Sequence, residues 1–463
     1  MTQVTKLFEL GQLSEASYAN LVSNMTPSAL IIQLQNADFN GMKFSATQAA
    51  EFADNWQVAT HQADTVTGFS ATLFKYIGND PNSGFVNGQY VYAIRGTAGE
   101  TDLVGADGGD IVLDGLALDQ IVDMYNDWKR INTAAGQHYQ AAVLAVNNAL
   151  SQELLDSTLA WNAYNANPFA VPLPSVLTPE QLLASYKTRS DIVIDLPSKT
   201  IRSIIFQDSG IAFSDNRAVG ARPAGFTGQV TDVTGHSLGG HLSAAFTRLF
   251  GSEALTINGA GFGGGGIAGI GTNATFNITN LFAMLGGSSQ FESSSIHNIY
   301  GDKMWELITQ NGPGLYQKGS HDALFIEQSI PWSNTAGHGS SQMIDSLAVA
   351  NLFIKLDASF STKTPAQVLA TLNALMKKGS NQVAQSLEKL VTSLTQYILG
   401  SETTIVTDDR ESLYVAIKNL TDSITALSLT GKVTLETTPA SASGARNDFS
   451  AFLSLHYLTP FAL

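Results

Sequence analysis

The pattern of apolar and polar positions predicts helices near both ends of the chain. Apolar residues recur at helical spacing through residues 1–25. Ser45 and Gln48 form a capping-box pattern ahead of an apolar run that reaches about Trp56. Residues 110–148 carry another helical pattern. Capped helical patterns follow one another toward the end of the chain and are expected at 364–379, 381–399, 408–420 and 447–458.

Strand patterns occupy the stretches between these helices. Residues 68–78 alternate apolar and polar positions, and 89–96 are rich in β-prone residues, so the two are expected as an antiparallel hairpin or as neighbouring strands. Residues 228–250 show the pattern of a strand, a sharp turn and a helix. Further strands are expected at 254–259 and 295–302. Strands that alternate with helices are typical of an α/β core.

This pattern predicts an α/β domain over residues 1–350 and a helical C-terminal extension over 351–463. The proline-rich stretch at about 150–226 holds one helix start at Thr178 and two strand-like runs. We expect it to be an insertion, or a small subdomain, ahead of the strand that opens the 228–250 unit.

Composition narrows the class of protein. The 463 residues include no cysteine, which excludes disulfides, thiolate metal sites and a cysteine nucleophile. The net charge of −15 argues against a nucleic-acid partner, because phosphate binding needs clustered basic residues. Charged residues make up only 14% of the chain and hydrophobic residues 44%, which suits a large core and contact with an apolar substrate.

The first residues of the sequence do not read as a secretory signal, because acidic residues occur early and no basic segment precedes an apolar run. No stretch is apolar for long enough to predict a transmembrane helix. We expect either secretion without a cleaved N-terminal signal or a cytoplasmic protein.

The motif that carries chemistry is Gly235-His236-Ser237-Leu238-Gly239, a G-x-S-x-G pattern between a predicted strand and a predicted helix. In this motif a serine nucleophile stands on a strained turn, and small residues two positions before and after it let the backbones pass closely. The alternative is a glycine-rich turn whose serine merely caps a helix.

A serine nucleophile needs an orienting acid and then a base, usually in that order along the chain. Asp302 ends the predicted strand at 295–302 and is the preferred acid, with Asp322 and Asp345 as competitors. His338 is the preferred base, because it lies in a loop that opens an apolar helix, and His321 is the alternative.

The oxyanion hole of such a site combines the N–H that follows the nucleophile with an N–H from an earlier loop at a strand end. These positions are Leu238 and Thr97, the latter in IRGTAG. His236 and His241 stand too close to Ser237 in sequence to act as its base, and we expect them to be packing or substrate-edge residues.

The motifs YAIRGT, VTGHSLGGHLS and NIYGD, with a late histidine before a helix, resemble the bacterial class-3 lipases exported by type I secretion. The resemblance covers roughly residues 1–350. It implies an α/β-hydrolase fold with a mostly parallel sheet, hydrolysis of triacylglycerol or phospholipid esters at a lipid–water interface, and Ser237, Asp302 and His338 as the triad. The chain contains none of the glycine- and aspartate-rich nonapeptide repeats of those lipases. We therefore expect it to be either the catalytic part of such a lipase or a member of a different branch of the family.

Two further segments have alternative interpretations. Seven aspartates between Asp102 and Asp127 predict either a solvated acidic helix face or a calcium site. By resemblance, Asp107 and Asp110 are the candidate calcium ligands, and no organic cofactor is expected. The glycine-rich stretch 259–271 is expected as a mobile apolar flap near the active site or as a flexible loop.

The sequence therefore predicts a serine hydrolase of lipid esters, a lipase or esterase that forms an acyl-enzyme on Ser237. The alternatives are a phospholipase A1 and a non-catalytic surface module on a hydrolase scaffold. A serine peptidase is a third class that the residues leave open.

Overall fold

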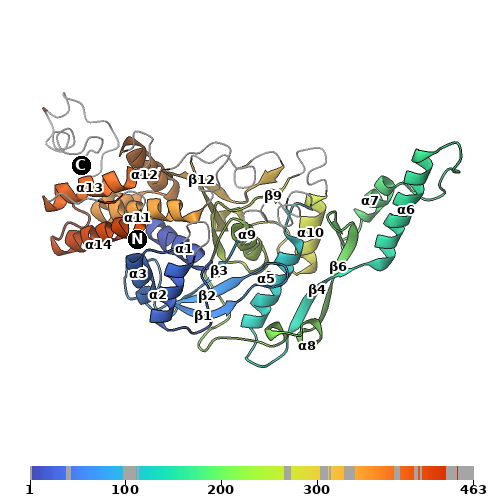
Figure 1. Cartoon of the computed structure of the whole chain (residues 1–463), viewed down its shortest axis with the longest axis horizontal. Helices are drawn as coiled ribbons and strands as arrows, with labels where there is room; N and C mark the ends of the chain where they lie inside the picture. The colour runs from blue at the N-terminus through green and yellow to red at the C-terminus, as the bar shows by residue number, and fades with distance from the viewer. Residues whose placement is uncertain are drawn as a thin grey trace.

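The computed structural model describes residues 3–37, 43–96, 111, 114–264, 273–302, 311, 314–327, 339–379, 386–400, 405–406, 409–433 and 446. A seven-stranded sheet runs through the middle of the molecule in the order β1-β2-β3-β7-β8-β10-β12 (Figure 1). The strands are β1 (Trp56–Gln62), β2 (Ala71–Tyr76), β3 (Tyr90–Ile94), β7 (Asp232–His236), β8 (Glu253–Ile257), β10 (Ile296–Gly301) and β12 (Ser320–Leu324). β1, β2 and β3 pair antiparallel, and the strands from β3 to β12 pair parallel.

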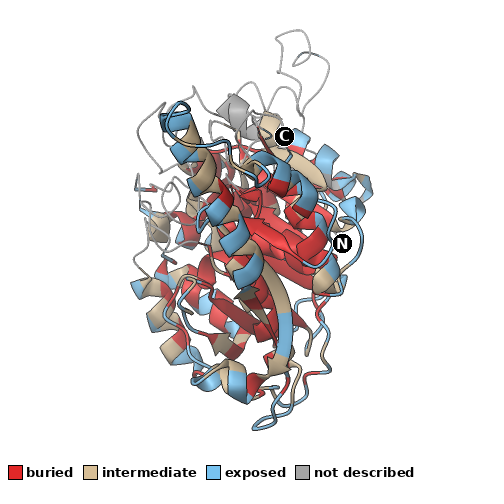
Figure 2. Ribbon diagram, turned by 90° about the vertical axis from the view of Figure 1, so that its right-hand side faces the viewer, coloured by how far each residue is buried: buried red, intermediate tan, exposed pale blue. Residues whose placement is uncertain are grey.

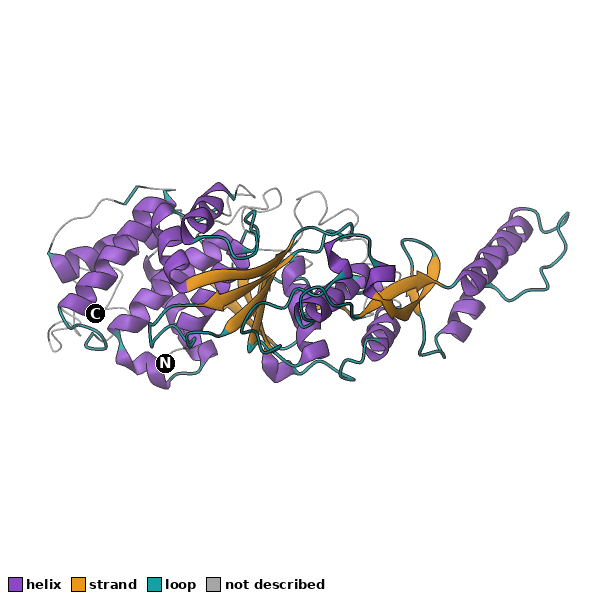
Figure 3. Ribbon diagram, turned by 90° about the horizontal axis from the view of Figure 1, so that it is seen from below, coloured by secondary structure: helices purple, strands orange, loops and turns teal. Residues whose placement is uncertain are grey.

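Helices cover both faces of this sheet, and the period of two along each strand explains why (Figure 3). In β3, Val91 and Ala93 belong to one hydrophobic core, whereas Tyr92 and Ile94 belong to the other. The first core is closed by α1 (Gln3–Ala16), α2 (Pro27–Asn36), α3 (Ala46–Asn55), α11 (Ser340–Leu356), α12 (Pro365–Gly379), α13 (Ser386–Leu399) and α14 (Arg410–Ala426). The second is closed by α5 (Leu118–Ile131), α9 (Leu238–Phe250) and α10 (Ala274–Met284). The described part is therefore an α/β protein with a mostly parallel sheet.

The predicted insertion forms an arm that projects from the body of the molecule (Figures 1 and 3), and its surface is largely exposed (Figure 2). It comprises the antiparallel sheet β4-β6-β5 and the two helices that lie beyond this sheet. Its elements are β4 (Gln140–Val146), α6 (Asn148–Ala166), α7 (Pro179–Tyr186), β5 (Val193–Asp195) and β6 (Thr200–Asp208), followed by α8 (Ser209–Ala212). The insertion thus begins with β4, ahead of the predicted boundary at residue 150.

The remaining described elements are short. They are the strands β9 (Phe262–Gly263) and β11 (Leu315–Tyr316), which pair with each other, and the 3-10 helices η1 (Asn216–Ala218), η2 (Ser293–Ser295) and η4 (Ala358–Thr362).

Several local predictions are confirmed. Ser45 and Thr178 both form complete capping boxes at the starts of α3 and α7. β2 and β3 form the expected antiparallel pair, and the 228–250 unit is a strand, a turn and a helix. The helix expected through residue 148 is wrong over 140–146, which form β4, because this segment pairs along its length with β6. The helix expected at 447–458 lies outside the described residues.

The predicted boundary at residue 350 falls inside α11, which packs on α1. The described residues of α12, α13 and α14 share one hydrophobic core with the N-terminal helices and the sheet. They are therefore part of the same packed body rather than a separate extension. Within the described ranges, no helix combines the length and apolar character needed to cross a bilayer.

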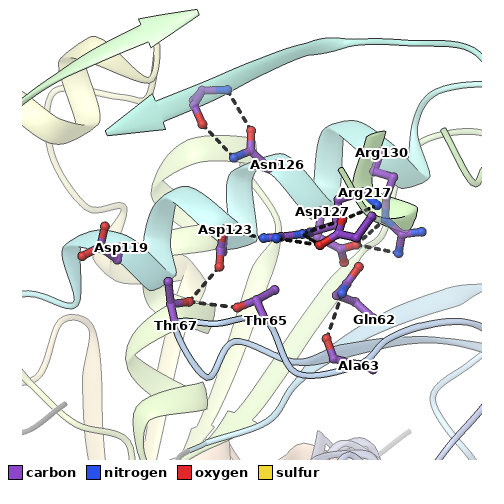
Figure 4. Close-up of polar contacts among 12 residues, drawn as sticks. Gln62, Ala63, Thr65, Thr67, Asp119, Asp123, Asn126, Asp127, Arg130 and Arg217 are labelled. Carbon is purple, nitrogen blue, oxygen red and sulfur yellow. Dashed lines mark hydrogen bonds and ion pairs between the residues drawn. The ribbon is translucent and has the colours of Figure 1, made fainter. Parts of the chain in front are cut away.

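Two buried asparagines fix the root of the arm to the body. Asn126 of α5 donates to the carbonyl of Ala142 in β4 and accepts from its N–H, both at 2.8 Å (Figure 4). Asn277 of α10 makes the same double contact with Ile194 of β5, again at 2.8 Å in both directions. Each asparagine satisfies backbone groups that the edge of a sheet would leave unpaired.

Replacing Asn126 with leucine should therefore lower the free energy of unfolding by about 1–3 kcal/mol, because the buried Ala142 groups lose their partner. The same change at the exposed Asn165 of α6 is the matched control and should leave stability nearly unchanged. Urea unfolding midpoints measure both variants. Equal midpoints for the two would show that Asn126 does not anchor the arm.

Candidate active site

Ser237 stands between β7 and α9 in a conformation that L-residues rarely adopt, with φ of 57° and ψ of −125°. Its side chain is 3% exposed. Non-glycine residues in such regions are strained, and this strain is found at functional sites more often than elsewhere. A strained serine on a turn from strand to helix is the geometry that the G-x-S-x-G motif predicts.

The alternative interpretation, that Ser237 merely caps a helix, is wrong. Ser237 occupies the N-cap position of α9 but makes no side-chain capping hydrogen bond. Ser45 and Thr178, at the equivalent positions of α3 and α7, do make this bond. The conformation of Ser237 therefore does not serve the helix by capping it.

Three glycines make this turn possible. A Cβ atom on Gly239 would collide with the backbone from Ile94 to Gly96, and one on Gly235 would collide with the backbone of Gly239. At Gly96 a Cβ would meet the carbonyl of His236 and lie 3.2 Å from the Cβ of Ser237. The start of α9, the end of β3 and the turn at Ser237 are therefore in direct backbone contact.

This contact bears on the predicted oxyanion hole. Leu238 is the first residue of α9 and is 2% exposed, and the first N–H groups of a helix have no acceptor within it. The loop that leaves β3 at Gly96 passes beside Ser237, and Thr97 is the next residue. Thr97 itself lies outside the described residues, so its role stays a prediction.

Asp302 follows β10, which is separated from β7 only by β8. Because the carboxyl ends of parallel strands share one edge, Ser237 and Asp302 both lie at the same edge of the sheet, with one strand between their own strands. The amide of Asp302 donates to the carbonyl of Leu324 at 2.8 Å, and its Oδ1 accepts from the Ile326 N–H at 3.2 Å. The backbone around the end of β12 thus holds this carboxylate at the carboxyl edge of the sheet.

The two competing acids lie elsewhere. Asp322 is inside β12, paired with Ile299 of β10 and away from the carboxyl edge. Asp345 lies in α11, where Arg410 forms an ion pair with it at 2.7 Å and the Tyr414 hydroxyl donates to it at 2.9 Å. Of the three candidates, only Asp302 stands at the strand-end position that the motif requires.

The predicted base His338 lies outside the described residues. The alternative, His321, is inside β12, where it pairs with Asn298, and its ring stacks on Tyr300 with centroids 4.1 Å apart. This position is three strands away from β7, which does not favour contact with Ser237. The helix expected after His338 is present as α11, with Gly339 at its N-cap, and the role of His338 itself stays a prediction.

His241, one of the two histidines that flank Ser237, is a packing residue. The His241 ring stacks on Phe262 at 3.9 Å, accepts from the Ala117 N–H at 3.3 Å, and its Nδ1 lies 3.1 Å from the carbonyl of Gly261. Burial lowers the pKa of His241 to about 4, so the ring is neutral near pH 7. Donation from Nδ1 to the Gly261 carbonyl and acceptance at the other nitrogen fit this neutral form.

One residue near the site was missed from the sequence. The hydroxyl of Tyr18 lies 2.8 Å from Nδ1 of His236, and it also lies where a side chain on Gly96 would be. Burial raises the pKa of Tyr18, so its hydroxyl stays protonated. The two rings are 218 positions apart in the chain, and no local pattern signals such a contact.

The described aspartates of the acidic segment do not form a solvated face (Figure 4). Asp114 and Asp127 are buried, and burial raises the pKa of Asp123. Asp119 binds Arg202 at 2.6 Å, Asp123 accepts from Thr67 at 2.7 Å, and Asp127 accepts from Tyr92 at 2.6 Å and Arg130 at 2.8 Å. The prediction of a solvated face is wrong for these residues because they pair with groups on other elements or within α5.

The calcium hypothesis concerns Asp107 and Asp110, which lie outside the described residues. Where the chain is described, no group of three histidine, aspartate or glutamate side chains comes together as a metal site would require. The hypothesis therefore stays a prediction about these two residues.

The described part of the glycine-rich stretch is neither a flap nor a flexible loop. Phe262 and Gly263 form β9, and side chains on Gly259 or Gly263 would collide with Thr256 or with Gly115 and Ala274. These glycines permit close packing around the end of β8, which is why the flexible interpretation is wrong for residues 259–264.

The sequence matches no protein-family model, and the search of curated proteins returned no match.

Proposed function

We propose that this protein is a serine hydrolase with an α/β-hydrolase fold that cleaves carboxylic esters of lipids. The observation that carries the proposal is the strained backbone of Ser237 at the carboxyl end of β7, without a capping role. A parallel sheet that continues past β7 to an acid after β10 supports the same architecture. Helix cover on both faces of the sheet is consistent with it.

In this proposal the hydroxyl of Ser237 attacks the ester carbonyl, and His338 accepts its proton. The carboxylate of Asp302 orients the imidazole and stabilises its charged form. Backbone N–H groups of Leu238 and Thr97 donate to the oxyanion of the tetrahedral intermediate. His338 then returns the proton to the leaving alcohol, and water, activated by the same histidine, releases the acid from Ser237.

The lipid character of the ester rests on the resemblance to type I-secreted lipases, and secretion without a cleaved signal is part of the same proposal. A panel of triglycerides of several chain lengths, phosphatidylcholine and short p-nitrophenyl esters tests it. Turnover of triglycerides supports a lipase, and preferential release of the sn-1 acid from phosphatidylcholine would make the protein a phospholipase A1. No turnover of any ester would favour the non-catalytic surface module.

Calcium would be held by Asp107 and Asp110, where a hard cation finds carboxylate oxygens. Its chemistry there is structural, fixing a segment of the chain, and no step of the reaction passes through it. Chelation is expected to reduce hydrolysis of lipid emulsions several-fold and to lower the melting temperature. Asp107→Asn should reproduce both effects, and added calcium should reverse only the chelator's effect. Unchanged activity and melting temperature in chelator would show that the protein does not use calcium in this way.

A further inference from the structure

We propose that the end of the arm, residues 157–179, is an anchor that inserts into the surface of an electrically neutral lipid phase. We call these residues the arm tip. They comprise the second half of α6, the connecting loop and the first residue of α7. The inference rests on the proposed function for the identity of the surface, but it concerns binding and not catalysis.

The composition of the arm tip is unlike that of the rest of the chain. Between Ser157 and Pro179 the sequence contains no aspartate, glutamate, lysine or arginine, in a protein with 63 such residues. Phe169 is fully exposed at 101%, and the other exposed large apolar side chains of the tip are Leu159, Leu173, Val176 and Leu177. Several large apolar side chains exposed within one uncharged segment are the kind of surface that marks an interaction site.

The tip is held in place although its apolar side chains are exposed. The Ser157 hydroxyl donates to the carbonyl of Leu177 at 2.7 Å, and the Trp161 indole N–H donates to the carbonyl of Val176 at 3.2 Å. The end of the loop is therefore bound to α6, which lowers the conformational entropy lost when the tip is ordered on a surface. The rings of Trp161 and Tyr164, 5.8 Å apart, lie just behind the loop, and such amphipathic rings favour the boundary between lipid and water.

The root of the arm does not depend on the tip. A separate hydrophobic cluster joins α7 to the sheet of the arm through Leu182, Tyr186, Ile192, Ile194 and Ile201. Arg202 links Asp119 of α5 at 2.6 Å with Asp195 of β5 at 2.9 Å, and the two asparagine contacts described above add to this link. The arm tip thus stands at the far end of an arm whose root is fixed to the body (Figures 1 and 3).

Geometry and charge favour a lipid surface over a protein partner. The tip is the outermost part of a projecting element, so a planar surface can reach it without meeting the body (Figure 1). Asp156 and Glu180 stand exposed at its two borders, and the whole chain carries a charge of −15. These charges limit the depth of insertion and repel anionic headgroups, so zwitterionic or uncharged lipid is the expected surface.

The test measures binding of the Ser237→Ala protein to phosphatidylcholine vesicles and to triolein emulsions by co-sedimentation or flotation. The double variant Phe169→Ser/Leu173→Ser should bind about tenfold or more weakly, because two inserted apolar side chains are lost. Val66→Ser is the matched control, since Val66 is 95% exposed on the body and should not affect binding. Vesicles with added phosphatidylglycerol should bind more weakly than pure phosphatidylcholine.

A second measurement looks for a new signal on binding and does not depend on a loss of binding. In Phe169→Trp, the indole emission should shift to the blue on addition of phosphatidylcholine vesicles. No binding by the Ser237→Ala protein, equal binding by the double variant, or an unshifted emission would each overturn the anchor. A dimeric wild type that does not bind vesicles, together with a monomeric double variant, would show that the tip joins two copies of the chain. That result would also overturn the anchor. Turnover of soluble p-nitrophenyl acetate by the double variant, with Ser237 intact, reports separately on the proposed catalytic function and should equal the wild type.

Discussion

Replacing Ser237 with alanine is expected to lower the rate of ester hydrolysis by about 10⁴-fold to 10⁶-fold, because the nucleophile of the acyl-enzyme is lost. The free energy of unfolding should change little, since the Ser237 side chain does not cap α9. The serine contributes its reactivity and not a stabilising hydrogen bond to the helix. Turnover of p-nitrophenyl butyrate and a urea unfolding curve measure the two effects on one preparation.

Ser45→Ala is the matched control, because Ser45 occupies the same N-cap position in α3 and does make the capping bond. This variant should lose about 0.5–2 kcal/mol of stability and keep its activity. Ser237→Ala should therefore lose activity and keep its stability, whereas Ser45→Ala should lose stability and keep its activity. Wild-type turnover by Ser237→Ala would rule out the proposed nucleophile.

Replacing Arg410 with leucine is expected to lower the free energy of unfolding by about 3–5 kcal/mol, the usual cost of breaking a buried ion pair. Arg410 of α14 binds Glu15 of α1 at 2.9 Å and Asp345 of α11 at 2.7 Å. The Glu15 side chain is fully buried and also accepts from the Ser341 hydroxyl at 2.6 Å. Since this network fixes the first turns of α11, directly after His338, activity should fall together with stability.

The loss should depend on pH. Burial raises the pKa of Asp345, and without the opposing guanidinium the carboxyl would bind its proton more tightly still. A carboxyl whose pKa is higher in the folded than in the unfolded protein stabilises the fold below the unfolded pKa, and this contribution disappears as pH rises. Arg410→Leu should therefore be less destabilised at pH 5 than at pH 8.

Lys418→Leu is the control on the same helix, because Lys418 pairs with Asp422 at 2.6 Å on the exposed face of α14. Surface pairs contribute little, so its unfolding midpoint should stay near that of the wild type at both pH values. Equal effects of the two substitutions would show that the buried network does not hold α11.

Where local signals were complete, the sequence predicted the structure. The strand, turn and helix around Ser237 follow from a β-prone run, two glycines with a defined spacing and an uninterrupted apolar helix. The capping box at Ser45 and the helix start at Thr178 could be predicted for the same reason, since every residue involved lies within four positions.

The errors and omissions arise where distant residues decide the outcome. Residues 140–146 form a strand because β6, more than fifty positions later, pairs with them. The pairing that makes a solvated face wrong at Asp119 has no local signal, because its partner Arg202 lies 83 positions away. Tyr18 reaches His236 only in the folded protein. Asp302 was expected at the end of a strand, and it follows β10 at the edge of the sheet where Ser237 follows β7.

Covalent labelling of the purified protein with an alkyl fluorophosphonate tests the central claim most directly, because this reagent reacts with activated serines. We predict one adduct per chain, located by peptide mass spectrometry on Ser237, and none in Ser237→Ala. Labelling should also fall sharply in Asp302→Asn and His338→Ala, although both residues are far from Ser237 in the sequence. An absence of adduct in the folded wild type, or an adduct that persists unchanged in Ser237→Ala, would contradict the account.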